Sequence, residues 1–282
     1  MFLRRRVGAV VCIGGLLLRC VLFGACAAAP VWSSPQELAR YWHTSVTRAL
    51  WLPDDEALRY AALLDAAWTK AELGAQPAQY VVLVDRSPVV QALLLVWKPT
   101  QGAALLIGAA PVSTGRAGRF DYFETPLGVF AHTLDNPDFR AEGTPNDNGI
   151  LGYGVRGMRV FDFGWQTTAR GWGDGHASPM RLQMHATDPV LLAPYLGTAR
   201  SKGCIRIAAD VNHLLDHFGV LDADYERALA QGQRLWMLAP DREPTPWPGR
   251  YLVVVQTQRH QRPAWAANPA KSAAPRRASE QP

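Results

Sequence analysis

The sequence predicts a mainly β domain with a few inserted helices, preceded by two N-terminal helices. Residues 79–257 hold short runs of β-branched and apolar residues that are separated by turn residues. Before that point, residues 30–78 show apolar residues at helical spacing instead. An apolar share of 48% with 19% charged residues over 282 residues supports a folded core and excludes disorder as the dominant state.

The first 29 residues have the composition of an export signal. Basic residues 4–6 precede an apolar run over residues 7–18, and small residues follow. This run is too short for a comfortable membrane span, so we expect a signal peptide that is cleaved after Ala27. The residues around Cys26 also resemble a lipoprotein box, which makes lipid anchoring through Cys26 the alternative.

Residues 30–78 are expected to form an N-terminal helical segment. Ser34-Pro35-Gln36-Glu37 is a capping box with proline at the first helical position, and it opens a helix towards Leu50. A second helix follows Pro53-Asp54, carries apolar residues on one side and stops near Gly74. Neither helix carries a group of residues typical of a catalytic or metal site, so both are interpreted as packing helices.

Strand patterns dominate the region from residue 79 to residue 257. The first three runs are separated by turn residues and indicate an antiparallel meander. Helical patterns intervene at Asp210–Phe218 and Asp222–Ala230. The expected strands are Tyr80–Asp85, Val89–Lys98, Ala103–Val112, Gly128–His132, Arg159–Phe163, Met180–Ala186, Arg234–Leu238 and Tyr251–Thr257.

Two polar stretches stand out beside these elements. Residues 133–178 are rich in Gly, Asn, Asp and Trp, and we expect a long insertion in which Trp165 and Trp172 line a substrate groove or plug the base of a loop. Residues 258–282 are expected to be a disordered basic tail.

The basic character of the chain comes from its two ends. The formal net charge is +5, but residues 1–29 hold four bases and no acid, and residues 258–282 hold five bases and one acid. The body between them is therefore mildly acidic. It offers no case for a nucleic-acid partner.

The cysteines narrow the search for a reactive group. Cys12, Cys20 and Cys26 lie in or beside the expected signal, so Cys204 is the single cysteine of the body. An unpaired thiol in an exported protein is either a small buried hydrophobe or a nucleophile. The neighbourhood of Cys204 decides between these two interpretations.

That neighbourhood contains the groups that a thiol nucleophile needs. A thiol requires a base to become a thiolate at neutral pH, and His185 ends a predicted strand close enough along the chain to return beside Cys204. Gly203 permits close approach of a substrate carbonyl. The backbone N–H groups of Gly203 and Cys204 are candidate oxyanion donors.

With His185 upstream, Ser201-Lys202-Gly203-Cys204-Ile205-Arg206 resembles the signature of the L,D-transpeptidase catalytic (YkuD) family. Val112-Ser113-Thr114-Gly115 and the segment Thr125–Phe130 also resemble family segments, in the expected order. The resemblance spans roughly residues 79–238. It implies a YkuD-like β-sandwich or barrel, a catalytic domain over residues 79–257, Cys204 as the nucleophile and His185 as the base.

The resemblance also implies roles for the neighbouring residues. The backbone carbonyl of Ala186, which stands where glycine is common in the family, orients His185. Lys202 replaces the histidine that many members carry, and it is a candidate substrate contact. Arg206 orients the signature loop or meets a substrate carboxylate. Ser201 hydrogen-bonds within the loop.

The implied reaction is acyl transfer on peptidoglycan stem peptides in the periplasm, which contributes to cell-wall biogenesis and cell shape. Cys204 forms an acyl-enzyme, and an acceptor amine from a second stem or from a wall-linked lipoprotein resolves it. A carbapenem is the implied covalent inhibitor, and no cofactor is implied. The alternatives are a hydrolase of the same fold, either an L,D-carboxypeptidase or an amidase that releases a wall-linked lipoprotein, and a non-catalytic wall-binding module.

Other groups of residues give weaker evidence for a functional site. His213 and His217 have the i, i+4 spacing of a zinc site, but no third ligand is evident, so no metal is expected. His132 and His176 are expected at the surface. Residues 152–157 have the spacing of a broken dinucleotide loop without βαβ context, which argues against a nucleotide site.

Overall fold

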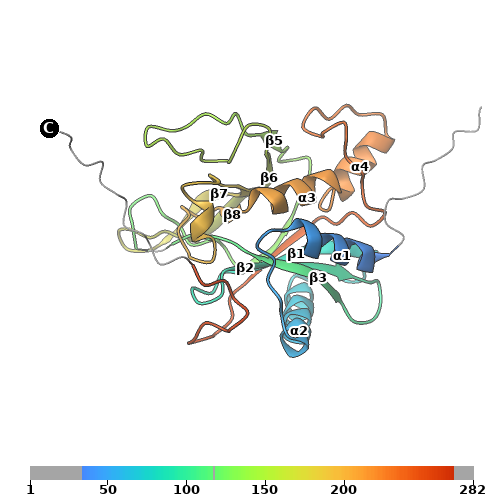
Figure 1. Ribbon diagram of the computed structural model, residues 1–282, viewed down its shortest axis with the longest axis horizontal. Coiled ribbons are helices and arrows are strands. Elements are labelled where there is room, and N and C mark those ends of the chain that lie inside the picture. The colour runs from blue at the N-terminus through green and yellow to red at the C-terminus, as the bar shows by residue number, and fades with distance from the viewer. Residues whose placement is uncertain (1–33, 117, 270–282) are drawn as a thin grey trace, which may run out of the picture.

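A computed structural model describes residues 34–116 and 118–269, and within them the chain forms two mixed sheets with four α-helices (Figure 1). The expected signal, Cys12, Cys20, Cys26 and the last part of the expected tail lie outside the described residues. The elements in chain order are α1 (Pro35–Ser45), α2 (Asp54–Lys70), β1 (Gln79–Asp85), β2 (Ala92–Lys98), β3 (Leu105–Pro111), β4 (Gly128–Ala131), β5 (Phe139–Arg140), β6 (Arg159–Ala169), β7 (Ala177–Ala186), η1 (Ala193–Tyr195), β8 (Ile205–Ile207), α3 (Ala209–His217), α4 (Ala223–Ala230) and β9 (Tyr251–Val255).

The first sheet has the strand order β3-β2-β1-β9-β4. The predicted antiparallel meander is confirmed, since β1 pairs with β2 and β2 with β3 in antiparallel register. The last strand, β9, enters between β1 and β4, parallel to the former and antiparallel to the latter. Every residue of β1 is buried, as expected for a central strand that is covered on both faces.

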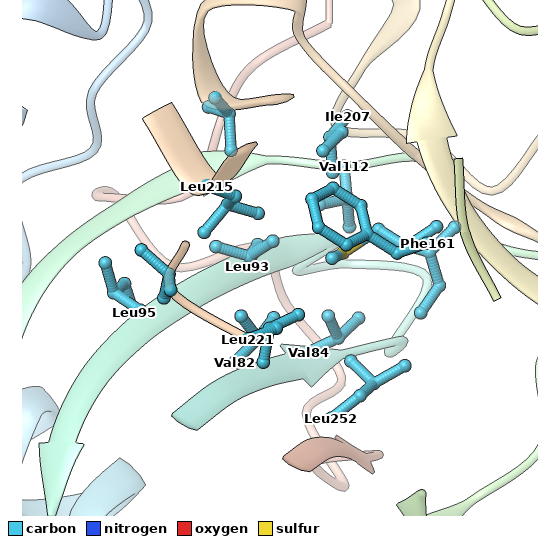
Figure 2. Packing of buried hydrophobic residues seen from close by; sticks show 14 of the residues in the cluster. Val82, Val84, Leu93, Leu95, Val112, Phe161, Ile207, Leu215, Leu221 and Leu252 are labelled. Atoms are coloured by element: carbon cyan, nitrogen blue, oxygen red, sulfur yellow. The ribbon is translucent and has the colours of Figure 1, made fainter. Parts of the chain in front are cut away.

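The two faces of this sheet belong to different cores. Val82, Val84, Leu93 and Leu95 point towards the second sheet, where Phe161, Ile207 and Leu215 complete one hydrophobic cluster (Figure 2). The alternate residues of the same strands point to the other side. There they meet the buried side of α2, which consists of Tyr60, Leu64 and Trp68. The side-chain alternation of the strands therefore separates the two cores.

The two N-terminal helices cover opposite faces of the first sheet (Figure 1). Trp42 of α1 is fully buried in the core between the sheets, and its indole N–H donates to the Ala109 carbonyl at 3.3 Å. None of the described helices is long and apolar enough to cross a membrane. The predicted fold class, mainly β with two preceding helices, is confirmed.

The second sheet has the order β5-β6-β7-β8. Parts of the long insertion expected over residues 133–178 belong to this sheet: β6 runs on to Ala169, and β7 begins at Ala177 and pairs with it, whereas residues 141–158 form a loop. The cross-strand ladder satisfies the backbone of this Gly- and Trp-rich stretch, so composition alone was misleading. Trp165 lies exposed on β6, whereas the Trp172 ring packs edge-on against Phe123 at a centroid distance of 4.9 Å.

A buried ionic network joins the second sheet to the helices that follow it. Arg159 is fully buried and donates to Asp138 at 2.6 Å and to both carboxylate oxygens of Asp222 at 2.7 and 2.8 Å. His132 contacts the other oxygen of Asp138 at 2.8 Å. The expected surface position of His132 is therefore wrong, because this side chain is fully buried as a partner of Asp138.

Two further expectations fail near the C-terminus. Arg234–Leu238 forms a turn and no strand, and the carbonyl of Met237 accepts from the Arg140 side chain at 2.7 Å. The expected disordered tail contains residues that pack on the body. Arg259 pairs with Glu56 of α2, and Trp265 contacts the Tyr60 ring edge-on at 5.8 Å. Long-range ion pairs and ring contacts thus hold this part of the chain on the body, although its composition is typical of a disordered tail.

Candidate functional site

The parallel pairing of β7 with β8 brings together the two signature segments. Met184 pairs with Ile205 and His185 with Arg206. Met184 and Ile205 are buried in the core between the sheets, so strand alternation directs His185, Cys204 and Arg206 to the opposite face. The imidazole and the thiol thus share one face of adjacent strands, with Cys204 one position before the start of β8.

His185 is held in one orientation. Its Nδ1 lies 2.6 Å from the carbonyl oxygen of Ala186, which leaves Nε2 as the nitrogen that can accept a proton. Burial lowers the pKa of His185 to about 4, and the nearby Arg206 charge lowers it further, against the opposing effect of the Ala186 hydrogen bond. The imidazole is therefore neutral at neutral pH. Ala186 occupies the orienting position that the sequence suggested for it.

Cys204 is a free, partly buried thiol on this face. Its Sγ donates to the Arg181 carbonyl at 3.7 Å. Burial raises the pKa of Cys204, whereas the backbone N–H of Gln183 and the Arg206 guanidinium lower it. Because burial is the largest of these effects, the thiol is protonated at rest and needs a base for reaction.

Hydrogen bonds within the signature loop and from Thr125 hold the loop in place. Ser201 Oγ donates to the Cys204 carbonyl and accepts from the Gly203 N–H at 3.1 Å. Thr125 Oγ1 donates to the Gly203 carbonyl at 2.6 Å and accepts from the Gly115 N–H at 2.8 Å. In the structure the Gly203 N–H donates to Ser201, and its oxyanion role stays a prediction.

Gly203 has a conformational reason to be glycine. Its φ is +136°, and a Cβ there would lie 2.8 Å from the Met180 sulfur and 3.2 Å from the Phe123 Cβ. A side chain at this position would displace the loop that carries Cys204. Glycine at position 203 thus permits the turn that leads into Cys204.

The two expected basic contacts have different surroundings. Lys202 is exposed, and its ammonium pairs with Asp121 at 2.5 Å. Arg206 is mostly buried on the face of Cys204, and burial lowers its pKa against the raising effect of the thiolate charge. The cation that acts on the thiol is therefore Arg206, although Lys202 is its nearer neighbour in the sequence.

Sequence reasoning missed three residues beside this pair. Tyr153 packs edge-on against the His185 ring at a centroid distance of 4.7 Å. Its hydroxyl donates to Gln183, whose amide donates to Asp162 at 2.8 Å. Gln183 could have been found, because it precedes His185 by two residues on a strand and so shares its face. Tyr153 and Asp162 come from other segments and gave no such signal.

The remaining histidines lie elsewhere. His213 and His217 stack on α3 at a centroid distance of 5.5 Å, and His176 is exposed beside Asp174. In residues 34–116 and 118–269 no group of three or more His, Cys, Asp or Glu side chains is placed to hold a metal ion.

Comparison with known proteins points to one family. The family model for the L,D-transpeptidase catalytic domain, YkuD, matches residues 79–223. No curated protein matches the chain. Among solved structures, a mutant of the helical cell shape determining protein Pgp2 from Campylobacter jejuni is 14% identical with a TM-score of 0.28, over 69% of this chain and 55% of that protein. The chain thus spans about half the length of that relative.

Proposed function

The chain belongs to the YkuD family of L,D-transpeptidase catalytic domains, and from that premise we propose that it is an exported peptidoglycan L,D-transpeptidase with Cys204 as nucleophile and His185 as base. The observation that carries the proposal is the shared face of β7 and β8. There the thiol, one position before β8, lies beside the strand that carries an imidazole whose Nδ1 is hydrogen-bonded to Ala186. The family acts on peptidoglycan peptides, which supports a stem-peptide substrate.

The reaction proceeds in two acyl-transfer steps. His185 Nε2 accepts the Cys204 proton while Sγ attacks the carbonyl carbon that joins the diamino acid of the stem to the following D-alanine. The C–N bond breaks, His185 returns the proton to the leaving D-alanine amine, and a thioester remains. The amine of an acceptor stem then attacks the thioester carbon and gives a proton to His185. The new C–N bond replaces the C–S bond, and His185 returns the proton to the Cys204 sulfur.

The resting protonation states fit this sequence. The thiol has a raised pKa and the imidazole a pKa of about 4, so the neutral pair is more stable than the thiolate–imidazolium pair. The base therefore has to take the thiol proton in the course of the reaction. Export to the periplasm belongs to the same proposal, with a lipid anchor at Cys26 as the alternative to cleavage after Ala27, and the composition of the first 29 residues supports it.

Purified stem peptides test the reaction and its outcome together. Incubation with the full chain is expected to give cross-linked dimers by mass spectrometry, and Cys204→Ala is expected to give none. Trimmed monomers alone would identify the hydrolase alternative of the same fold. Binding to cell-wall material without turnover and without thiol reactivity would identify a non-catalytic module.

Carbapenem acylation tests the nucleophile separately. Intact mass after incubation is expected to show one added inhibitor on the wild-type chain and none on Cys204→Ala. His185→Ala is expected to slow acylation by about 100- to 10,000-fold, the range typical of general-base catalysis. An equal adduct on Cys204→Ala would rule out the assignment.

A further inference from the structure

A loop from outside the signature segments covers the candidate base. The rings of Tyr153 and His185 meet edge to face, with centroids 4.7 Å apart and planes inclined at 72°. The Ala186 carbonyl already holds one nitrogen of this imidazole, and the tyrosine ring restricts the rotation that is left. Cys204 lies close enough that its thiolate charge contributes to the raised pKa of Tyr153, after the larger effect of burial.

The loop is fixed to the strand end that carries His185. The Leu151 N–H donates to Asp188 Oδ2 at 3.0 Å. Gly154 has a φ of +85°, and a Cβ at this position would lie 2.8 Å from the Cβ of Ala186. Glycine thus allows the backbone to pass directly over the residue that orients the imidazole. Tyr153 stands between these two anchor points.

The tyrosine hydroxyl joins the loop to the strand beneath the thiol. It donates to Gln183 Oε1 at 3.1 Å, and Gln183 Nε2 donates to Asp162 Oδ2 at 2.8 Å. Arg181 Nε donates to the same carboxylate oxygen at 2.8 Å, while the carbonyl of Arg181 accepts from the Cys204 thiol. One chain of contacts therefore connects the residue that covers the base with the residues that hold the nucleophile.

We propose that Tyr153 is a positioning residue for the acyl transfer: its ring fixes the His185 imidazole and shields it from water, and its hydroxyl keeps the ring in place through Gln183. The inference rests on the proposed function, because it assigns Tyr153 a role in the same reaction. Tyr153 acts through His185, and its cover contributes to the burial that lowers the pKa of the imidazole.

Tyr153→Ala and Tyr153→Phe separate the two contributions. In Tyr153→Ala water reaches the imidazole, so the pKa of His185, followed by NMR titration, is expected to rise from about 4 towards its ordinary value. The kcat on stem peptides is expected to fall about 10- to 100-fold with little change in KM, since misplacement of a catalytic group acts on the chemical step. Tyr153→Phe keeps the ring and loses the Gln183 bond, so a loss of about 3- to 10-fold in kcat and in the rate of Cys204 alkylation by iodoacetamide is expected.

Tyr195→Phe is the matched control, because it removes a phenolic hydroxyl outside this chain of contacts and is expected to leave both rates unchanged. Wild-type kcat and an unchanged His185 pKa in folded Tyr153→Ala would overturn the proposal. If that variant does not fold, wild-type rates in Tyr153→Phe overturn it. If the wild-type chain turns over no stem peptide, the proposed function fails, whereas the His185 titration and the alkylation rates still decide the role of Tyr153.

Discussion

At the scale of single residues, the environment of Cys204 and His185 sets their chemistry. Burial opposes charge on both groups, since it raises the pKa of the thiol and lowers that of the imidazole. The Arg206 charge lowers the pKa of both groups, because a positive charge stabilises the thiolate and destabilises the imidazolium. The reactivity of the pair therefore depends on a side chain that takes no proton itself.

Removing the Arg206 charge should change the pH dependence of the thiol. In the wild-type chain the rate of alkylation by iodoacetamide is expected to rise with pH through a midpoint above the ordinary thiol value of about 8.5, because burial raises the pKa. Arg206→Met is expected to move this midpoint higher and to slow alkylation at pH 7.5 by about 3- to 10-fold. Lys202→Met is the control, since its ammonium faces Asp121. A midpoint that stays in place or falls in Arg206→Met would contradict this assignment.

At the scale of elements, the pairing of β7 with β8 assembles the site and α1 supports the core behind it. The strand β8 has three residues, and it is held by β7 on one side and by an isolated bridge from Ser113 to Arg206. The core beneath these strands extends through Val82 and Leu93 to the buried side of α1. An N-terminal helix thus shares a hydrophobic cluster with the strands of the signature segments.

Trp42→Ala tests this support. The side chain is fully buried, and its removal leaves a cavity and breaks the indole hydrogen bond to Ala109. We expect a loss of about 3–5 kcal/mol in the free energy of unfolding, measured by urea denaturation. Trp51→Ala is the control, because this ring is 70% exposed and its loss should cost less than about 0.5 kcal/mol. Equal losses in the two variants would show that α1 does not stabilise the core.

At the scale of the whole molecule, the folded unit is larger than the segment that the family model matches. The match ends at residue 223, yet β9 begins at Tyr251 and lies inside the first sheet, between β1 and β4. Beyond β9, Trp265 packs in the cluster on the outer face of this sheet. The strand β9, which follows the matched segment, therefore completes the first sheet.

A chain that ends at residue 249 should not fold. Without β9 the backbone of β1 loses its parallel partner, and β4 loses the strand that attaches it to the sheet. We expect no cooperative thermal transition by circular dichroism. A chain that ends at residue 269 keeps every described contact and is expected to unfold cooperatively. A cooperative transition in the shorter chain would show that β9 is dispensable.

The sequence by itself predicted the first meander, which is confirmed, and it proposed Cys204 and His185 as the reacting pair. A lone body cysteine in its signature, a histidine at a strand end and apolar runs between turns are local patterns that need no knowledge of distant contacts. Gln183 could be placed beside His185 by strand alternation alone. The long β6–β7 hairpin was hidden because its Gly- and Trp-rich composition resembles that of a loop.

Tertiary structure decided what these patterns could not. The cover of His185 by Tyr153, the use of the Gly203 N–H by Ser201 and the insertion of β9 beside β1 each depend on contacts with a partner that local composition does not identify. Burial then set the charge states, because the pKa of a thiol or an imidazole depends on the surroundings that the folded chain builds around it. Local patterns in the sequence gave the candidate groups, and long-range packing fixed their geometry.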